Sequence, residues 1–321
     1  MSMEAIRINN YSFSKPLTSD NSGFSKWGIG LRGGQNYFVK EFLSPVYPAE
    51  DAVFTEKKKQ ERIRLCQTFI EEKSNLYSAI RDASDGRVIT VEQFFRVGAK
   101  FYISTKAITD PVMSISDIAR CPFVERLRLC CSIAHAMAGI HDKKIVHADI
   151  KPDNILVVRQ NGLQANIIDF DCSFFEFKSP KLGEELNGDL VYLSPEGFLH
   201  IAEVESNLGC KMDVFALGLL FHQYFTGKLP GFNSTEYQYA YESVLDDHPL
   251  GVHGLENMDC RHIVEQMLNK KPEDRPDMRT VFSSFNKILL QMLNRSTPEK
   301  AVAEVSAFDF FFQPGGDLSE W

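Results

Sequence analysis

The sequence predicts an α+β protein whose first third is rich in β-strands and whose remainder is mainly helical. Residues 26–31 and 36–42 alternate apolar and polar side chains around two glycines, which is typical of a β-hairpin, and residues 88–97 and 100–108 alternate similarly. After a charged helix expected at residues 55–79, apolar side chains recur at helical spacing. This second pattern occupies residues 123–141, 213–220 and 228–292.

Length and composition limit the classes of protein that this chain can represent. Its 321 residues allow one large two-lobed domain or two small ones. A formal net charge of −8 argues against general binding of nucleic acid or anionic membranes, and no apolar run reaches the length of a membrane span. The seven cysteines form no C-x-x-C pair, and the first residues lack a secretion signal pattern. We therefore expect reduced, mostly buried thiols in a cytoplasmic protein.

Two short stretches hold the side chains that phosphoryl transfer requires. Residues 145–154 read IVHADIKPDN, and residues 167–171 read IIDFD. A carboxylate can orient and deprotonate an attacking hydroxyl, an ammonium can meet the charge on the transferred group, and oxygen ligands can hold Mg²⁺. The candidates are Asp149 and Lys151 for the first two roles, and Asn154 and Asp169 for the metal.

The order of these residues resembles that of a known family. His-x-Asp-x-Lys-x-x-Asn, followed fifteen residues later by Asp-Phe-x, is similar to the catalytic and metal loops of eukaryotic-type (Hanks-type) serine/threonine protein kinases. The resemblance covers about residues 12–292 and implies a two-lobed protein-kinase-like fold. The implied parts are a β-rich N-lobe at 1–108, a mainly helical C-lobe at 109–294 and a tail at 295–321. It also implies ATP and Mg²⁺ as cofactors and a protein as substrate.

The resemblance also implies a nucleotide site. Lys40 would contact the α- and β-phosphates and pair with Glu72 on the following helix, for which Glu71 is the alternative. The adenine would meet three further positions: Thr105 at the back of the pocket, the hinge residue Ala107 and Leu156 beneath the ring.

The resemblance further implies a glycine-rich loop that covers the phosphates. Residues 28–33 match the family's G-x-G-x-x-G spacing, but Gly33 lies only seven residues before Lys40, too near for a loop and two strands. Gly23 lies seventeen residues before Lys40 and leaves that room. We therefore expect the loop at residues 18–23, where Ser, Asp and Asn favour a turn with exposed N–H groups.

Four positions depart from the family pattern. Phe38 replaces a small residue that packs on adenine, and Ala148 replaces an arginine that receives an activating phosphate. Asp171 replaces a glycine in the metal loop, and Asp189 replaces a threonine near the catalytic aspartate. Phe38, Asp171, Asp189 and the single glycine of the expected phosphate loop favour a non-catalytic, kinase-like scaffold. The loss of the arginine at Ala148 instead implies activity without that phosphate switch.

Three functions remain open at this point: an active protein kinase, a scaffold and a kinase of a small molecule. The six filled polar positions favour an active kinase, and the motif beginning at Ser194 argues against a small-molecule kinase. The resemblance also implies a structural pair between Glu196 and Arg275, and a role for Asp213 in holding the catalytic loop. Residues 307–321 are aromatic and acidic, and would fold back on their own chain or dock on a partner.

Overall fold

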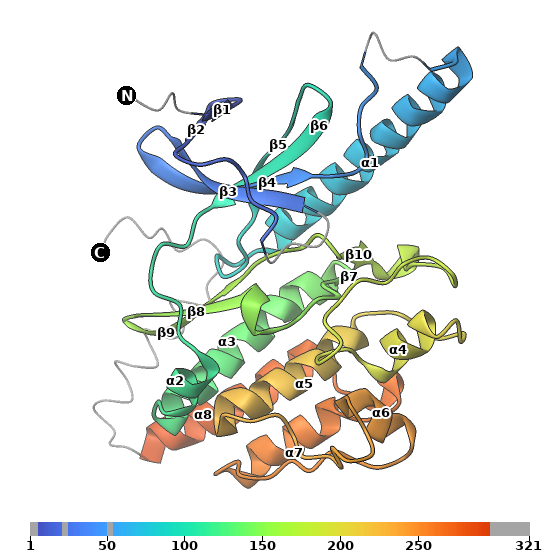
Figure 1. Cartoon of the computed structure of the whole chain (residues 1–321). Helices are drawn as coiled ribbons and strands as arrows, with labels where there is room; N and C mark the ends of the chain where they lie inside the picture. The colour runs from blue at the N-terminus through green and yellow to red at the C-terminus, as the bar shows by residue number, and fades with distance from the viewer. Residues whose placement is uncertain (1–5, 21–24, 50–53, 296–321) are drawn as a thin grey trace. The chain divides into compact units, whose positions relative to one another are not determined.

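The computed structural model describes residues 6–20, 25–49 and 54–295. The chain divides into two compact units: the first runs through Asp82 and includes Ile89–Thr109, and the second comprises Ala83–Val88 and the chain from Asp110 onward. The first unit contains a six-stranded sheet and one long helix, and the second is mainly helical (Figure 1). The predicted α+β class is therefore confirmed.

The sheet of the first unit is antiparallel, with strand order β1-β2-β3-β4-β6-β5. The expected hairpin is confirmed, because β3 pairs with β4 around Gly33 and Gly34, whose φ angles of 58° and 81° suit glycine. The strands are β1 (Ile6–Ile8), β2 (Tyr11–Phe13), β3 (Ser25–Arg32), β4 (Gln35–Phe42), β5 (Val91–Val97) and β6 (Lys100–Lys106).

Strand β4 faces two different environments because its side chains alternate. Tyr37 and Val39 enter an aromatic cluster with side chains of β2 and β6. Phe42 lies on the opposite face, where its ring centroid is 5.2 Å from that of Phe69 on helix α1 (Glu56–Ala83). Lys40 has the same parity as Phe42, so the strand directs it to the face that α1 covers.

The glycines of β3 serve packing. A Cβ atom at Gly28 would lie 2.8 Å from Leu17 Cδ2, and one at Gly30 would lie 2.8 Å from Phe13 Cζ and 3.1 Å from Tyr11 Cβ. Gly28 and Gly30 lie within β3, which argues against the G-x-G-x-x-G match at residues 28–33 as a phosphate loop.

Gly30→Ala should lower the free energy of unfolding by about 1–3 kcal/mol, because the added methyl would overlap the buried Phe13 ring and lie close to Tyr11 Cβ. Denaturation followed by fluorescence of Trp27 on the same strand would measure the change. Ile29→Ala is the matched control, since Ile29 is 48% exposed on the other face and should cost less than about 1 kcal/mol. Equal losses in both variants would contradict the packing role of Gly30.

The second unit is built around two buried helices, α3 and α5. The residues expected to face the core of α3 (Leu127, Cys130, Cys131, Ala134 and Ala138) are all buried, and α5 is buried nearly all round. Its helices are α2 (Ile115–Ala119), α3 (Phe123–Asp142), α4 (Pro195–Ile201), α5 (Lys211–Thr226), α6 (Ala240–Leu245), α7 (Met258–Met267) and α8 (Met278–Arg295). Its strands are β7 (Ile145–Val146), β8 (Ile155–Gln160), β9 (Gly162–Ile167) and β10 (Phe174–Phe175).

A short segment after α1 holds the end of β9. Asp85 accepts hydrogen bonds from Arg87 and from His135 Nδ1 of α3, the latter at 2.9 Å. Burial raises the pKa of Asp85, but the bond from His135 and the charge of Arg87 outweigh it, so the pKa lies below its ordinary value. The carbonyl of Arg87 accepts the N–H of Ile167 at 2.8 Å, which fixes β9 two residues before Asp169.

All seven cysteines are free, and five of them are buried, as expected from the sequence. Within residues 6–20, 25–49 and 54–295, no helix combines the length and apolar character needed to span a bilayer.

Candidate active site

A buried carboxylate on α5 holds the loop that carries Asp149. Asp213, 1% exposed, accepts the backbone N–H groups of His147 at 2.7 Å and Ala148 at 2.9 Å. His141 Nε2 approaches the same carboxylate at 3.0 Å. A carboxylate is stable in such a buried place only when donors surround it, so these bonds lock the loop onto α5. The expected role of Asp213 is confirmed.

His147 joins the two loops that the sequence singled out. The N–H of Asp149 donates to its Nδ1 at 3.3 Å, which assigns the ring proton to Nε2. Nε2 then donates to the carbonyl of Ile168 at 3.0 Å, and the ring packs on Phe170 with centroids 4.6 Å apart. Since both nitrogens are engaged and the side chain is buried, His147 is a structural residue.

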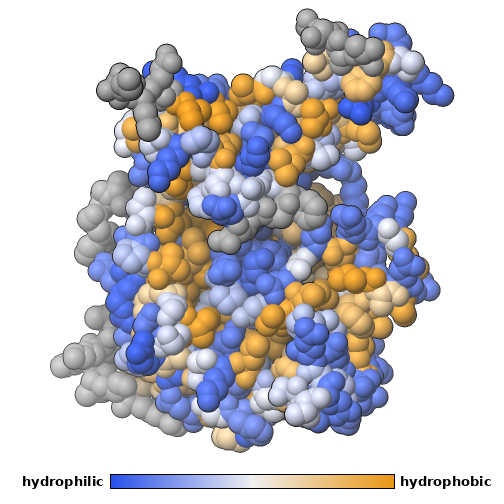
Figure 2. Space-filling view, in the orientation of Figure 1, coloured by the Kyte–Doolittle hydropathy of each residue, from blue (hydrophilic) through white to orange (hydrophobic). Residues whose placement is uncertain are grey.

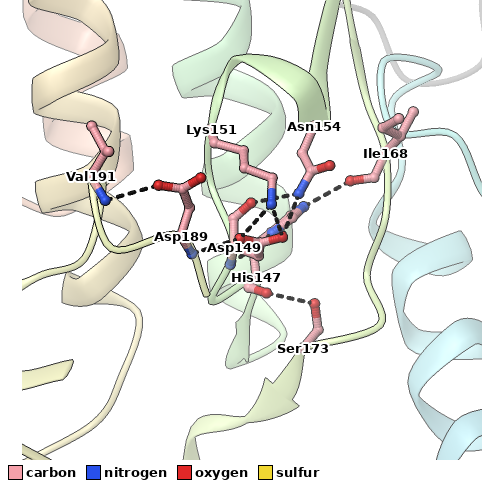
Figure 3. A network of polar contacts seen from close by, with 8 residues as sticks. All are labelled: His147, Asp149, Lys151, Asn154, Ile168, Ser173, Asp189 and Val191. Carbon is pink, nitrogen blue, oxygen red and sulfur yellow. Dashed lines mark hydrogen bonds and ion pairs between the residues drawn. The ribbon is translucent and has the colours of Figure 1, made fainter. Parts of the chain in front are cut away.

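Three donors converge on the Asp149 carboxylate (Figure 3). Lys151 Nζ donates at 2.8 and 3.1 Å, and Asn154 Nδ2 donates at 2.8 Å. The backbone N–H of Asp189 donates at 3.1 Å. The carboxylate is 11% exposed, so it is held in one orientation while an edge stays accessible.

The Lys151 ammonium lies among several carboxylates. Burial lowers its pKa, but the hydrogen bond to Asp149 and the charges of Asp149, Asp189 and Asp169 outweigh burial and raise the pKa above its ordinary value. Lys151 therefore remains a cation at neutral pH, which is the state needed to meet negative charge on a phosphoryl group.

Asn154 and Asp169 supply oxygens suited to Mg²⁺. Asn154 Nδ2 donates to both Oδ2 and the backbone carbonyl of Asp149, which leaves Oδ1 pointing toward the segment of Ile168, the residue before Asp169 (Figure 3). Asp169 is exposed at the end of that segment. Across the described ranges, no three His, Cys, Asp or Glu side chains form a metal-binding group. This donor pair fits a Mg²⁺ ion that also binds phosphate oxygens.

The departure at Asp171 does not fall on a left-handed position. Asp169, rather than Asp171, takes the left-handed conformation, with φ of 62°, and aspartate tolerates this region better than most residues. Ala148 has φ of 65° in the catalytic loop. A Cβ atom at Gly188 would lie 2.9 Å from the carbonyl oxygen of Ala148. Residues 187–189 can therefore approach the catalytic loop this closely only because position 188 is glycine.

Asp189 acts on Asp149 through its backbone. Its own carboxylate accepts the N–H of Val191 at 2.8 Å and so stabilises the turn (Figure 3). Sequence reasoning considered only the charge of this side chain and missed the backbone donor. No signal in the sequence marks that donor, because every residue except proline carries one.

The candidate residues of the first unit differ in their burial. Lys40, 8% exposed on β4, is buried, whereas Glu72 is exposed on α1. One residue further, Lys73 is half-buried with Nζ 5.9 Å from the ring centroid of Tyr77. Gly23 lies outside the described residues.

The adenine candidates lie on or beside the strands where they were expected. Thr105 is half-buried on β6 opposite Phe38, whose ring stacks on Trp27 at 5.5 Å between centroids. The N–H of Ala107 donates to the carbonyl of Asn36 at 3.2 Å, so this donor is already engaged within the sheet. In the second unit, Leu156 is half-buried on β8, two residues after Asn154.

Comparison with known families identifies the class of this fold and site. The family model described as protein kinase domain matches residues 53–285, more than two thirds of the chain. The chain therefore belongs to the protein kinase domain family, which confirms the resemblance seen in the sequence.

Individual relatives are distant. Calcium-dependent protein kinase 27 of Arabidopsis thaliana is 23% identical over 268 residues, covering 83% of this chain and 52% of the relative. Receptor-interacting serine/threonine-protein kinase 1 of Homo sapiens is 22% identical over 321 residues, covering 93% and 44%. The chain thus spans about half the length of these relatives. The kinase PK-1 of Cydia pomonella granulovirus has a similar fold, with a TM-score of 0.59, 16% identity and coverage of 86% and 92%.

Proposed function

We propose that this chain is an active serine/threonine-type protein kinase that transfers the γ-phosphoryl group of ATP to a protein hydroxyl. The observation that carries the proposal is the Asp149 carboxylate, oriented by Lys151, Asn154 and the N–H of Asp189. Binding without catalysis would not require three hydrogen-bond donors that orient one accessible carboxylate.

Each polar group has one part in the transfer. Asp149 accepts the proton of the substrate hydroxyl, and Lys151 stays protonated beside it to meet the charge on the transferred group. Asn154 and Asp169 would hold Mg²⁺, which when bound neutralises charge on the phosphates. In the first unit, we assign the phosphate contact to Lys40 with Glu72 as its partner, and coverage of the phosphates to the loop of Gly23. Adenine recognition is assigned to Thr105, Leu156 and Ala107, the last through its carbonyl because its N–H already donates within the sheet.

Exposed apolar side chains support a protein substrate rather than a small molecule. The segment after β10 exposes Phe177 by 71%, Leu182 by 54% and Leu190 by 43%. Figure 2 shows apolar surface over this segment, which Figure 1 places beside β10. Such surface is typical of contact with another polypeptide. The free cysteines support a reducing, cytoplasmic location, and the acidic aromatic residues 307–321 are proposed to dock on their own chain or on a partner.

The test is mass spectrometry of the full chain and of each acceptor after incubation with Mg-ATP and a panel of protein and metabolite acceptors, with Asp149→Asn measured in parallel. Phosphate added to protein by the wild type alone supports the proposal. ATP binding without transfer to any acceptor would favour the scaffold, and transfer only to a metabolite would favour a small-molecule kinase.

Asp169→Asn should weaken Mg-ATP binding by at least about tenfold and lower turnover, because the neutral amide loses the charge that attracts the cation. Calorimetric titration with ATP, with and without Mg²⁺, measures the effect. Asp171→Asn is the matched control on the same loop and should change affinity less than about threefold. An unchanged Mg²⁺ dependence in Asp169→Asn would remove this residue from the metal site.

A further inference from the structure

The first turns of α1 form a local positive surface on an acidic protein. We call residues 56–65 the basic helix end. These ten residues carry five cations and two anions, although the whole chain has a net charge of −8. Every residue of the basic helix end is exposed except Lys59 and Ile63, which are half-buried. Five cations within ten residues make a local potential that would attract an anionic segment.

This surface also exposes apolar side chains, and it lies outside the hydrophobic core of its unit. The buried residues of α1 begin only at Cys66, and Figure 1 shows the helix running past the edge of the sheet. Leu65 is 59% exposed and Phe54 is 38% exposed, with the Arg62 guanidinium 4.2 Å from the Phe54 ring centroid. Figure 2 shows apolar atoms among the hydrophilic surface of this helix end. Cations interleaved with exposed apolar side chains suit an occupant that is both acidic and aromatic.

The chain itself contains such a segment at residues 307–321. It has three acidic residues, five aromatic residues and no Lys, Arg or His; the acidic ones are Asp309, Asp317 and Glu320, and the aromatic ones are Phe308, Phe310, Phe311, Phe312 and Trp321. We propose that this segment docks on the basic helix end, with its carboxylates on the cations and its rings against Phe54 and Leu65. The inference does not depend on phosphoryl transfer, since it uses none of the residues assigned to that reaction.

Charge distinguishes this surface from another exposed apolar region of the protein. The segment at residues 176–190 also exposes large apolar side chains, among them Phe177. It carries four acidic residues and only two lysines, so it would repel residues 307–321. An uncharged aromatic segment could bind to either surface, but an acidic aromatic segment binds better to the basic helix end.

Photo-crosslinking in the full chain tests the docking. A benzoylphenylalanine placed at Leu65 should crosslink to the peptide that contains residues 307–321, whereas the same probe at Phe177 should not. Charge reversal of Lys57, Lys58 and Arg62 to Glu should lower the yield about tenfold, and so should high salt. Reversal of three exposed lysines elsewhere, Lys143, Lys228 and Lys271, is the matched control and should leave the yield unchanged.

Mass spectrometry of the crosslinked products decides the outcome. A crosslink to residues 307–321 supports the docking whether it forms within one chain or between two copies, which gel mobility separates. Crosslinks from Leu65 to other peptides only, or equal yields from Leu65 and Phe177, would overturn it. Circular dichroism of each variant checks that α1 remains folded, so that a lost crosslink reports the contact.

Discussion

Asp149→Asn should lower the rate of phosphoryl transfer by about 10²–10⁴-fold while changing ATP affinity less than about threefold. The substitution removes the carboxylate that accepts the proton, and it places an amide NH₂ group among hydrogen-bond donors. Lys151, Asn154 and the N–H of Asp189 all donate to this carboxylate, so the NH₂ group of the substituted side chain would face a donor. Steady-state transfer to a protein acceptor, with ATP binding measured separately, would show the two effects.

Asp153→Asn is the matched control for this prediction. Asp153 lies in the same loop and is exposed, and no hydrogen bond from it to Asp149 is present in the described structure. Its substitution should leave transfer within about twofold of the wild type. If Asp149→Asn kept more than about a tenth of the wild-type rate, Asp149 would not be the base.

Arg275→Met should lower the free energy of unfolding by about 3–5 kcal/mol, because it leaves the buried Glu196 carboxylate without its partner. The two side chains are 0% and 5% exposed and form a bidentate pair at 2.6 and 2.9 Å. The guanidinium also donates to the carbonyls of Asn269, Lys211 and Lys270. Chemical denaturation would measure the loss, and this pairing confirms the expectation from the sequence.

A double-mutant cycle separates the pair from its surroundings. Glu196→Met in the Arg275→Met background removes the stranded charge, so the double variant should be less destabilised than the sum of the single variants. Arg279→Met is the control, since its pair with Asp142 is mainly exposed and should contribute less than about 1 kcal/mol. Strict additivity of the two buried substitutions would contradict the coupling.

Local sequence was sufficient for much of the fold. Alternation around Gly33 and Gly34 predicted the β3–β4 hairpin, because the two-residue period of a strand and a left-handed turn are properties of adjacent residues. The helical repeat of α3 identified its buried side chains for the same reason. The rejection of Gly28 and Gly30 as phosphate-loop residues also followed from spacing alone, and the side chains that require glycine at these positions appeared only in the structure.

The sequence by itself determined the class of the protein and the residue types of its chemistry, since Asp149, Lys151 and Asn154 share one loop and Asp169 follows a short hairpin. Only the tertiary structure decided how that chemistry is oriented. The backbone N–H of Asp189 reaches Asp149 from a distant part of the chain, and His147 Nε2 reaches the backbone carbonyl of Ile168. Backbone donors are identical at every position, and contacts between distant segments depend on packing, so neither leaves a pattern in the sequence.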